Sequence, residues 1–204
     1  MIVLSHRGFW RSAEEKNTEV AFERTVACGF GTETDVRDRA GRLVVSHDPA
    51  GDEALDWDGL LDRFDARGLP LAVNIKADGL SEALRTAFEG RDIDWFAFDM
   101  SGPETLRYAR AGLPYFTRHS DIEPAPILYA EAAGIWLDSF GDFWFDEDTI
   151  QRHLDAGKRV CVVSCELHGR DPSRLWDRLE PLKATGSLML CTDKPNLAQA
   201  RFLS

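Results

Sequence analysis

The sequence IVLSHRGF, residues 2–9, starts as an apolar run and stops on a histidine, an arginine and a glycine. The apolar run is typical of a β-strand that is covered on both faces, and its polar end indicates where the strand leaves the core. Runs of this kind recur along the whole chain and alternate with helical stretches. This alternation is the main evidence for the fold.

We expect strands at 2–6, 31–36, 71–76, 95–100, 115–118, 134–139, 159–164 and 187–193, and a hairpin that closes on Gly41 and brings in residues 43–47. Helix-start residues and glycine stops predict helices over 17–27, 81–89, 103–112, 126–133, 146–157 and 172–186. Eight strands that alternate with helices favour a small (β/α)8 TIM barrel, with an open doubly wound sheet as the alternative. No linker divides the chain, so we expect a single domain over residues 1–204.

The composition limits the classes of partner. The chain has 24 Lys plus Arg against 35 Asp plus Glu, a formal charge of −11. Such a surface repels nucleic acids and anionic membranes. No apolar stretch approaches the ~20 residues of a membrane span, and we expect no signal peptide, no membrane insertion and a cytoplasmic protein. Cys161 and Cys191 lie in apolar runs, as buried free thiols do.

Polar side chains stand at nearly every strand end. In a barrel these ends meet at one rim, where the active site is built. In chain order they are His6, Arg7, Glu33, Asp35, His47, Asn74, Lys76, Asp99, Arg118, Asp138, Glu166 and Asp193.

Glu33 and Asp35 are expected to face the same way, because side chains alternate along a strand and these two are two rises, ~6.6 Å, apart. Two buried carboxylates repel each other unless a cation lies between them, and Mg²⁺ or Ca²⁺ prefers such oxygen ligands. The alternative is a buried ion pair with Arg7 or Lys76.

His6 and His47 follow neighbouring elements, and two imidazoles across a bound group can serve as base and acid near neutral pH. A site role for His119 stays open, whereas His153 falls within a predicted helix and is expected on the surface.

Together these residues resemble the signature of the glycerophosphodiester phosphodiesterases, in the superfamily of the phosphatidylinositol-specific phospholipases C. The matching stretches are His6-Arg7-Gly8, Asn17-Thr18, Glu33-x-Asp35, His47-Asp48 and, more loosely, Asn74-Ile75-Lys76 and Thr192-Asp193-Lys194-Pro195.

The resemblance implies a metal-dependent phosphoric diester hydrolase that acts on a glycerophosphodiester or related small phosphodiester, as in lipid metabolism. It assigns acid–base catalysis to His6 and His47, phosphate binding to Arg7 and Lys76, and Mg²⁺ or Ca²⁺ to Glu33, Asp35 and Asn74. We add Arg118, at a strand end, to the phosphate-binding candidates.

The chain departs from the family at four places. Lys16 and Asn74 each replace a glutamate, the long insertion between His47 and Asn74 is missing, and Ser164-Cys165-Glu166 stands where the family has Trp-Thr. The alternative function is therefore a catalytically weakened barrel that binds a phosphorylated metabolite or a partner protein without turnover.

Overall fold

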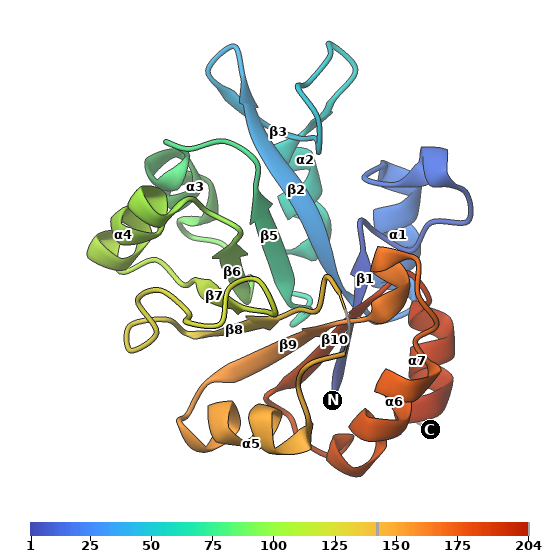
Figure 1. Cartoon of the computed structure of the whole chain (residues 1–204). Coiled ribbons are helices and arrows are strands. Elements are labelled where there is room, and N and C mark those ends of the chain that lie inside the picture. Colours follow the sequence, from blue (N-terminus) through green and yellow to red (C-terminus); the bar gives the residue numbers. More distant parts are fainter. Residues whose placement is uncertain (142, 204) are drawn as a thin grey trace.

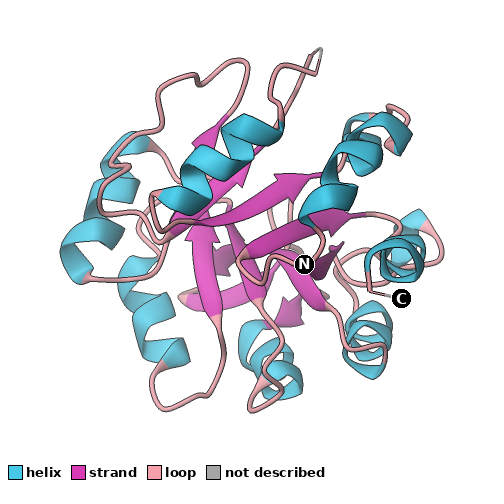
Figure 2. Cartoon of the chain, turned by 90° about the horizontal axis from the view of Figure 1, so that it is seen from below, coloured by secondary structure: helices cyan, strands magenta, loops and turns pink. Residues whose placement is uncertain are grey.

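The computed structural model describes residues 1–141 and 143–203. Strands form the centre and helices surround them (Figures 1 and 2). The strands are β1 (Ile2–His6), β2 (Gly31–Arg39), β3 (Arg42–Val45), β4 (Leu55–Asp56), β5 (Leu71–Ile75), β6 (Trp95–Phe98), β7 (Phe116–His119), β8 (Gly134–Leu137), β9 (Arg159–Val163) and β10 (Leu188–Thr192).

The helices follow the strands on the outside. The α-helices are α1 (Glu19–Ala27), α2 (Trp57–Phe64), α3 (Ser81–Phe88), α4 (Gly102–Ala111), α5 (Glu147–Asp155), α6 (Ser173–Leu179) and α7 (Pro195–Phe202). Short 3-10 helices are η1 (Ala13–Glu15), η2 (Cys165–His168) and η3 (Glu180–Leu182). Among the residues described, no helix has the length and apolar character needed to cross a membrane.

Parallel pairing runs around a ring of strands. From β6 it passes through β5, β2, β1, β10, β9 and β8 to β7. Between β6 and β7 a single parallel bridge, Ala97 to Tyr115, links the two ends of this path. The hairpin strands β3 and β4 extend from β2 by antiparallel pairing. The expected (β/α)8 barrel is therefore the architecture, with the hairpin as an addition.

Large side chains fill the interior of the ring. Phe96 stacks on Phe116 with ring centroids 3.6 Å apart, and Phe98 stacks on Trp136 at 3.8 Å. Ala97, between the two phenylalanines, instead joins the cluster that packs against the helices. This alternation follows from the two-residue period of a strand, and it gives the barrel a solid floor below the rim.

The predicted strands are confirmed, with ends that differ by up to three residues, and so is the hairpin, whose turn places Ala40 and Gly41 at positive φ.

The prediction of a helix over 126–133 is wrong. That segment forms turns, because backbone groups at two of its positions make hydrogen bonds with Tyr115. The Tyr115 hydroxyl donates to the carbonyl of Leu128 at 2.9 Å, and the Ala133 amide donates to the carbonyl of Tyr115 at 2.9 Å.

Candidate active site

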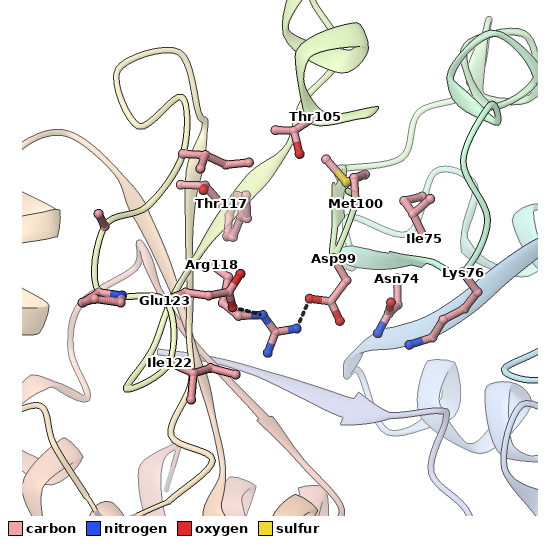
Figure 3. Close-up of a pocket in the computed structure, with 14 residues that line it drawn as sticks. Asn74, Ile75, Lys76, Asp99, Met100, Thr105, Thr117, Arg118, Ile122 and Glu123 are labelled. Atoms are coloured by element: carbon pink, nitrogen blue, oxygen red, sulfur yellow. Dashed lines mark hydrogen bonds and ion pairs between the residues drawn. The ribbon is translucent and has the colours of Figure 1, made fainter. Parts of the chain in front are cut away.

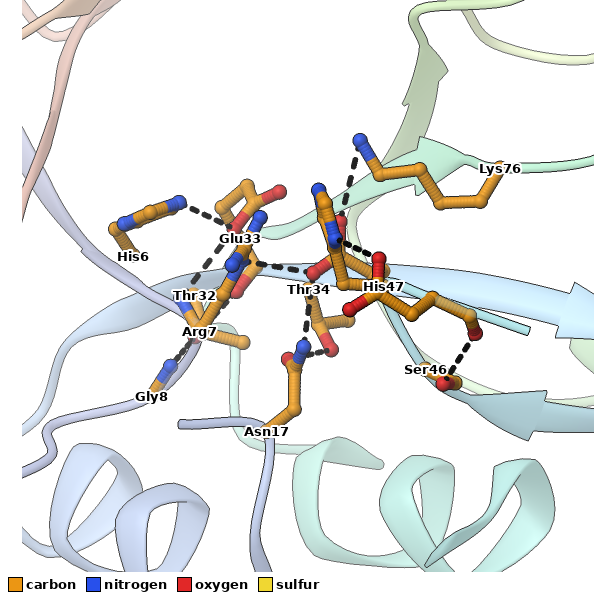
Figure 4. A network of polar contacts seen from close by, with 12 residues as sticks. His6, Arg7, Gly8, Asn17, Thr32, Glu33, Thr34, Ser46, His47 and Lys76 are labelled. Atoms are coloured by element: carbon orange, nitrogen blue, oxygen red, sulfur yellow. Dashed lines mark hydrogen bonds and ion pairs between the residues drawn. The ribbon is translucent and has the colours of Figure 1, made fainter. Parts of the chain in front are cut away.

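The carboxyl ends of β1, β2 and β5 bring the predicted catalytic and metal-binding residues together. His6 is paired in register with Glu33, and Asp35 with Asn74. Figure 4 shows His6 and His47 on opposite sides of a group that contains Arg7 and Glu33. The neighbouring strands thus assemble side chains that are up to 68 positions apart in the chain, from His6 to Asn74.

The turn after β1 requires a glycine at position 8. Arg7 and Gly8 have φ angles of 58° and 83°, the left-handed region in which a side chain causes strain. A Cβ on Gly8 would lie 2.7 Å from the Cβ of Ala21 on α1. The tight turn lets the amide of Arg7 donate to the carbonyl of Glu33 at 2.9 Å, so the backbone itself points Arg7 back over β2.

Asp35 is fully buried and surrounded by donors. Its Oδ2 lies 2.8 Å from Nε of Arg7 and accepts a hydrogen bond from Nδ2 of Asn17 at 2.8 Å. Its Oδ1 lies 3.4 Å from Nζ of Lys76. The ion-pair alternative from the sequence therefore describes Asp35, because both predicted cations are in contact with it.

Glu33 differs from Asp35 in its electrostatic surroundings. The residue is 1% exposed, and burial together with the charge of Asp35 raises its pKa from 4.5 to about 7, although His6, Arg7 and Lys76 act in the opposite direction. Nε2 of His6 lies 3.8 Å from its Oε2. The positive charges of the described residues around it therefore do not offset the effects of burial and of Asp35 on this carboxyl group.

His6 is oriented by a residue that the sequence did not assign to the site. Nδ1 of His6 lies 2.7 Å from Oδ1 of Asp193, at the end of β10. Burial would raise the pKa of Asp193, but the hydrogen bond and charge of His6, with Lys16 and Arg7, outweigh it and lower that pKa. Because an ionised carboxylate only accepts, Nδ1 carries a proton, and Nε2 is the ring nitrogen that faces Glu33.

The sequence feature that could have identified Asp193 as a site residue is its position at a strand end, within Thr192-Asp193-Lys194-Pro195. Its partner, however, lies 187 positions away.

His47 follows β3 and has a 44% exposed side chain, with Nδ1 3.0 Å from Oδ1 of Asp48. It lines, with Arg7 and Lys16, a cavity of about 540 Å³. Lys16 itself lies over the ring of Trp10, with Nζ 4.5 Å from its centroid. The second histidine is thus open to solvent at the side of the site opposite His6.

The oxygen atoms of Glu33, Asp35 and Asn74 fit a hard divalent cation such as Mg²⁺ or Ca²⁺. Oδ1 of Asp35 and Oδ1 of Asn74 are buried and have no hydrogen-bond partner within the described part of the chain. They come from residues paired in register, and Glu33 stands two residues before Asp35 on β2. Residues 1–141 and 143–203 contain no group of three His, Cys, Asp or Glu side chains that could hold a metal ion. A cation here would therefore also need the amide oxygen of Asn74 as a ligand.

Arg118 lines a second cavity, of about 650 Å³, together with Asn74 and Lys76 (Figure 3). Its guanidinium contacts three carboxylates: it pairs with Asp99, with Asp138 at 2.8 Å and with Glu123 at 3.1 Å. A phosphate at Arg118 would therefore compete with three carboxylates of the protein.

The expectation that His153 lies on the surface is wrong. It is 7% exposed, its Nε2 lies 3.0 Å from Nδ1 of His119, and its Nδ1 lies 2.9 Å from the hydroxyl of Tyr129. Burial, then the charges of His119 and Arg152, lower its pKa to about 4. His119 is thereby part of a neutral structural pair next to the rim.

Comparison with known proteins supports the fold. No family model and no curated protein matches the chain. Among solved structures it is similar to a glycerophosphodiester phosphodiesterase from Agrobacterium tumefaciens str. C58, at 18% identity over 97% of this chain and 98% of that one, with a TM-score of 0.70. It is also similar to a Ca²⁺-dependent phosphatidylinositol-specific phospholipase C from Streptomyces antibioticus, at 11% identity over 96% and 94%, with a TM-score of 0.52.

Proposed function

We propose that this chain, which shares its fold with a glycerophosphodiester phosphodiesterase and a phosphatidylinositol-specific phospholipase C, is a divalent-metal-dependent phosphodiester hydrolase that acts on a glycerophosphodiester or a related small phosphodiester. The observation that carries the proposal is the His6–Asp193 pair beside the buried Glu33, next to two buried oxygens that accept no hydrogen bond from the described residues, Oδ1 of Asn74 and Oδ1 of Asp35, the latter 3.4 Å from Nζ of Lys76.

His6 is suited to act as the base. The bond to Asp193 keeps the proton on Nδ1, so Nε2 can remove a proton from water or from a neighbouring hydroxyl of the substrate. When Nε2 takes that proton, the imidazolium lies between the carboxyl groups of Asp193 and Glu33, which stabilise its charge. The exposed imidazole of His47 is then the group that donates to the leaving oxygen.

Arg7 and Lys76 bind the phosphoryl group. Arg7 contacts Asp35 through Nε, which leaves its two Nη groups for phosphoryl oxygens, and Lys76 is held beside the same carboxylate. Glu33, Asp35 and Asn74 would hold Mg²⁺ or Ca²⁺, and a bound ion would supply charge stabilisation for the phosphoryl oxygens. Direct attack by water gives a monoester, whereas attack by a substrate hydroxyl gives a cyclic phosphate.

Turnover of bis(p-nitrophenyl) phosphate with Mg²⁺, Ca²⁺ or Mn²⁺ tests the proposal. We expect metal-dependent release of p-nitrophenol that is lost with EDTA and falls at least ~10²-fold in His6→Ala, the usual contribution of a general base. Thermal unfolding of the variant checks that it remains folded.

The alternative function, binding of a phosphorylated metabolite or partner without turnover, draws on the neutral Asn74 and on the two cations that already contact Asp35. It predicts that inorganic phosphate or a phosphodiester binds by calorimetry while no member of a broad phosphodiester panel is cleaved with any of the three metals. That result would replace the hydrolase proposal.

A further inference from the structure

Glu166 connects the ends of two neighbouring strands near His6. It lies on η2, directly after β9, and reaches across to the end of β10. Its Oε1 accepts hydrogen bonds from the hydroxyl of Thr192 and, at 3.2 Å, from the amide of Asp193, and its Oε2 accepts from the hydroxyl of Ser164. The carboxylate therefore holds the backbone of the residue whose side chain orients His6.

The two hydroxyl groups next to Glu166 require a hydrogen-bond acceptor at each of its two side-chain oxygens. The oxygen of Ser164 already accepts from Nε1 of Trp176 at 2.8 Å, and the oxygen of Thr192 accepts from the amide of Lys194 at 3.0 Å. Both hydroxyl protons are therefore directed at Glu166. A carboxylate, with two accepting oxygens, satisfies both sides, whereas an amide would turn an NH₂ group towards one of them.

No salt bridge explains the acid at this position. Among residues 1–141 and 143–203, no lysine, arginine or histidine lies within ion-pair distance of Glu166, although His6, at the next strand, pairs with Asp193. The carboxylate instead accepts from neutral donors: the hydroxyl of Ser164 just after β9, the hydroxyl of Thr192 at the end of β10 and the amide of Asp193 in the following turn.

We propose that Glu166 is a positioning residue for the His6–Asp193 pair: it fixes the turn at Thr192–Lys194 so that Asp193 keeps the proton of His6 on Nδ1 and Nε2 towards Glu33. The inference rests on the proposed function for its effect on catalysis.

The test compares Glu166→Gln with Glu23→Gln, a matched change on the exposed face of α1. Side-chain ¹⁵N–¹H NMR at one fixed pH, in EDTA-treated protein, reports the His6 tautomer, with the signal assigned by His6→Gln. We expect wild type and Glu23→Gln to show one protected Nδ1–H signal. Glu166→Gln should lose this signal or show both tautomers, and its kcat should fall ~10-fold with KM little changed, the scale of an outer-shell partner.

A Glu166→Gln protein with the wild-type His6 signal overturns the inference, whatever its activity. Glu166→Asp provides a second test because it keeps two accepting oxygens: it should preserve more of the Nδ1–H signal and of kcat than the glutamine variant, and an equal or larger loss refutes the role. The NMR measurement needs no substrate. Failure of wild type to cleave any phosphodiester would therefore refute the proposed function separately.

Discussion

Replacing Glu33 with glutamine is expected to stabilise the metal-free protein above pH 7. Glu33 is 1% exposed, and burial and the neighbouring Asp35 raise the pKa of its carboxyl group from 4.5 to about 7. Between these two pH values the folded state keeps the proton while the unfolded state has lost it. Unfolding then releases a proton, so the free energy of unfolding decreases as the pH rises through this interval.

The size of the effect follows from the two pKa values. One pH unit of difference corresponds to about 1.36 kcal/mol, so wild type should lose about 3 kcal/mol between pH 4.5 and pH 7 through this group alone. Glutamine has nearly the shape of the protonated glutamate and never ionises. The variant therefore avoids this loss, and the difference between the two proteins should level off above pH 7.

Urea unfolding with EDTA at pH 5 and pH 8, followed by tryptophan fluorescence, measures the difference. Other titrating groups are common to both proteins and cancel in the comparison, and Glu23→Gln, an exposed change on α1, should behave as wild type. The same Glu33→Gln variant should bind Mg²⁺ or Ca²⁺ more weakly by calorimetry. Equal changes of unfolding free energy from pH 5 to pH 8 in wild type and Glu33→Gln would refute the reasoning.

Three further predictions concern other residues. Asp193→Asn should lower kcat ~10- to 100-fold, because a hydrogen bond from His6 to a charged acceptor is worth about 1.5–3 kcal/mol; a steady-state assay with wild-type kcat would contradict this. Asn74→Glu should tighten Mg²⁺ or Ca²⁺ binding in calorimetry relative to the exposed control Asn196→Glu, and unchanged affinity would remove Asn74 from the ligand set. The neutral His153, with its pKa lowered to about 4, should make wild type lose stability as the pH falls from 6.5 towards 4, and His153→Gln should show a flatter profile in urea unfolding.

Local patterns predicted most of the strands and the first turn of the site. The apolar run at residues 2–5, the acidic pair at 33 and 35 and the glycine at position 8 are features of short segments; the structure places the first two on β1 and β2 and gives Gly8 a positive φ. Helix α2 shows the limit of this approach: no helix was predicted over residues 57–64, although Trp57, Leu60, Leu61 and Phe64 form a buried face there.

Errors arose where distant partners decide the outcome. Residues 126–133 have a helix-like composition, but their hydrogen bonds to Tyr115 make them turns. His153 lies on α5 with no local signal for its direction, and only the barrel brings Tyr129 and His119, 24 and 34 positions away, to its two nitrogens.

The sequence by itself determined which polar side chains stand at the strand ends, because strand period and turn chemistry act over a few residues. Only the tertiary structure decided how they are paired: that Asp193 contacts His6, that Arg7 and Lys76 share Asp35, and that Arg118 is surrounded by carboxylates. The physical reason is that these contacts form when the ring of strands brings β1 between β2 and β10. Burial then raises the pKa of Glu33, and this burial depends on the elements that the fold packs around β2 rather than on the sequence of the strand.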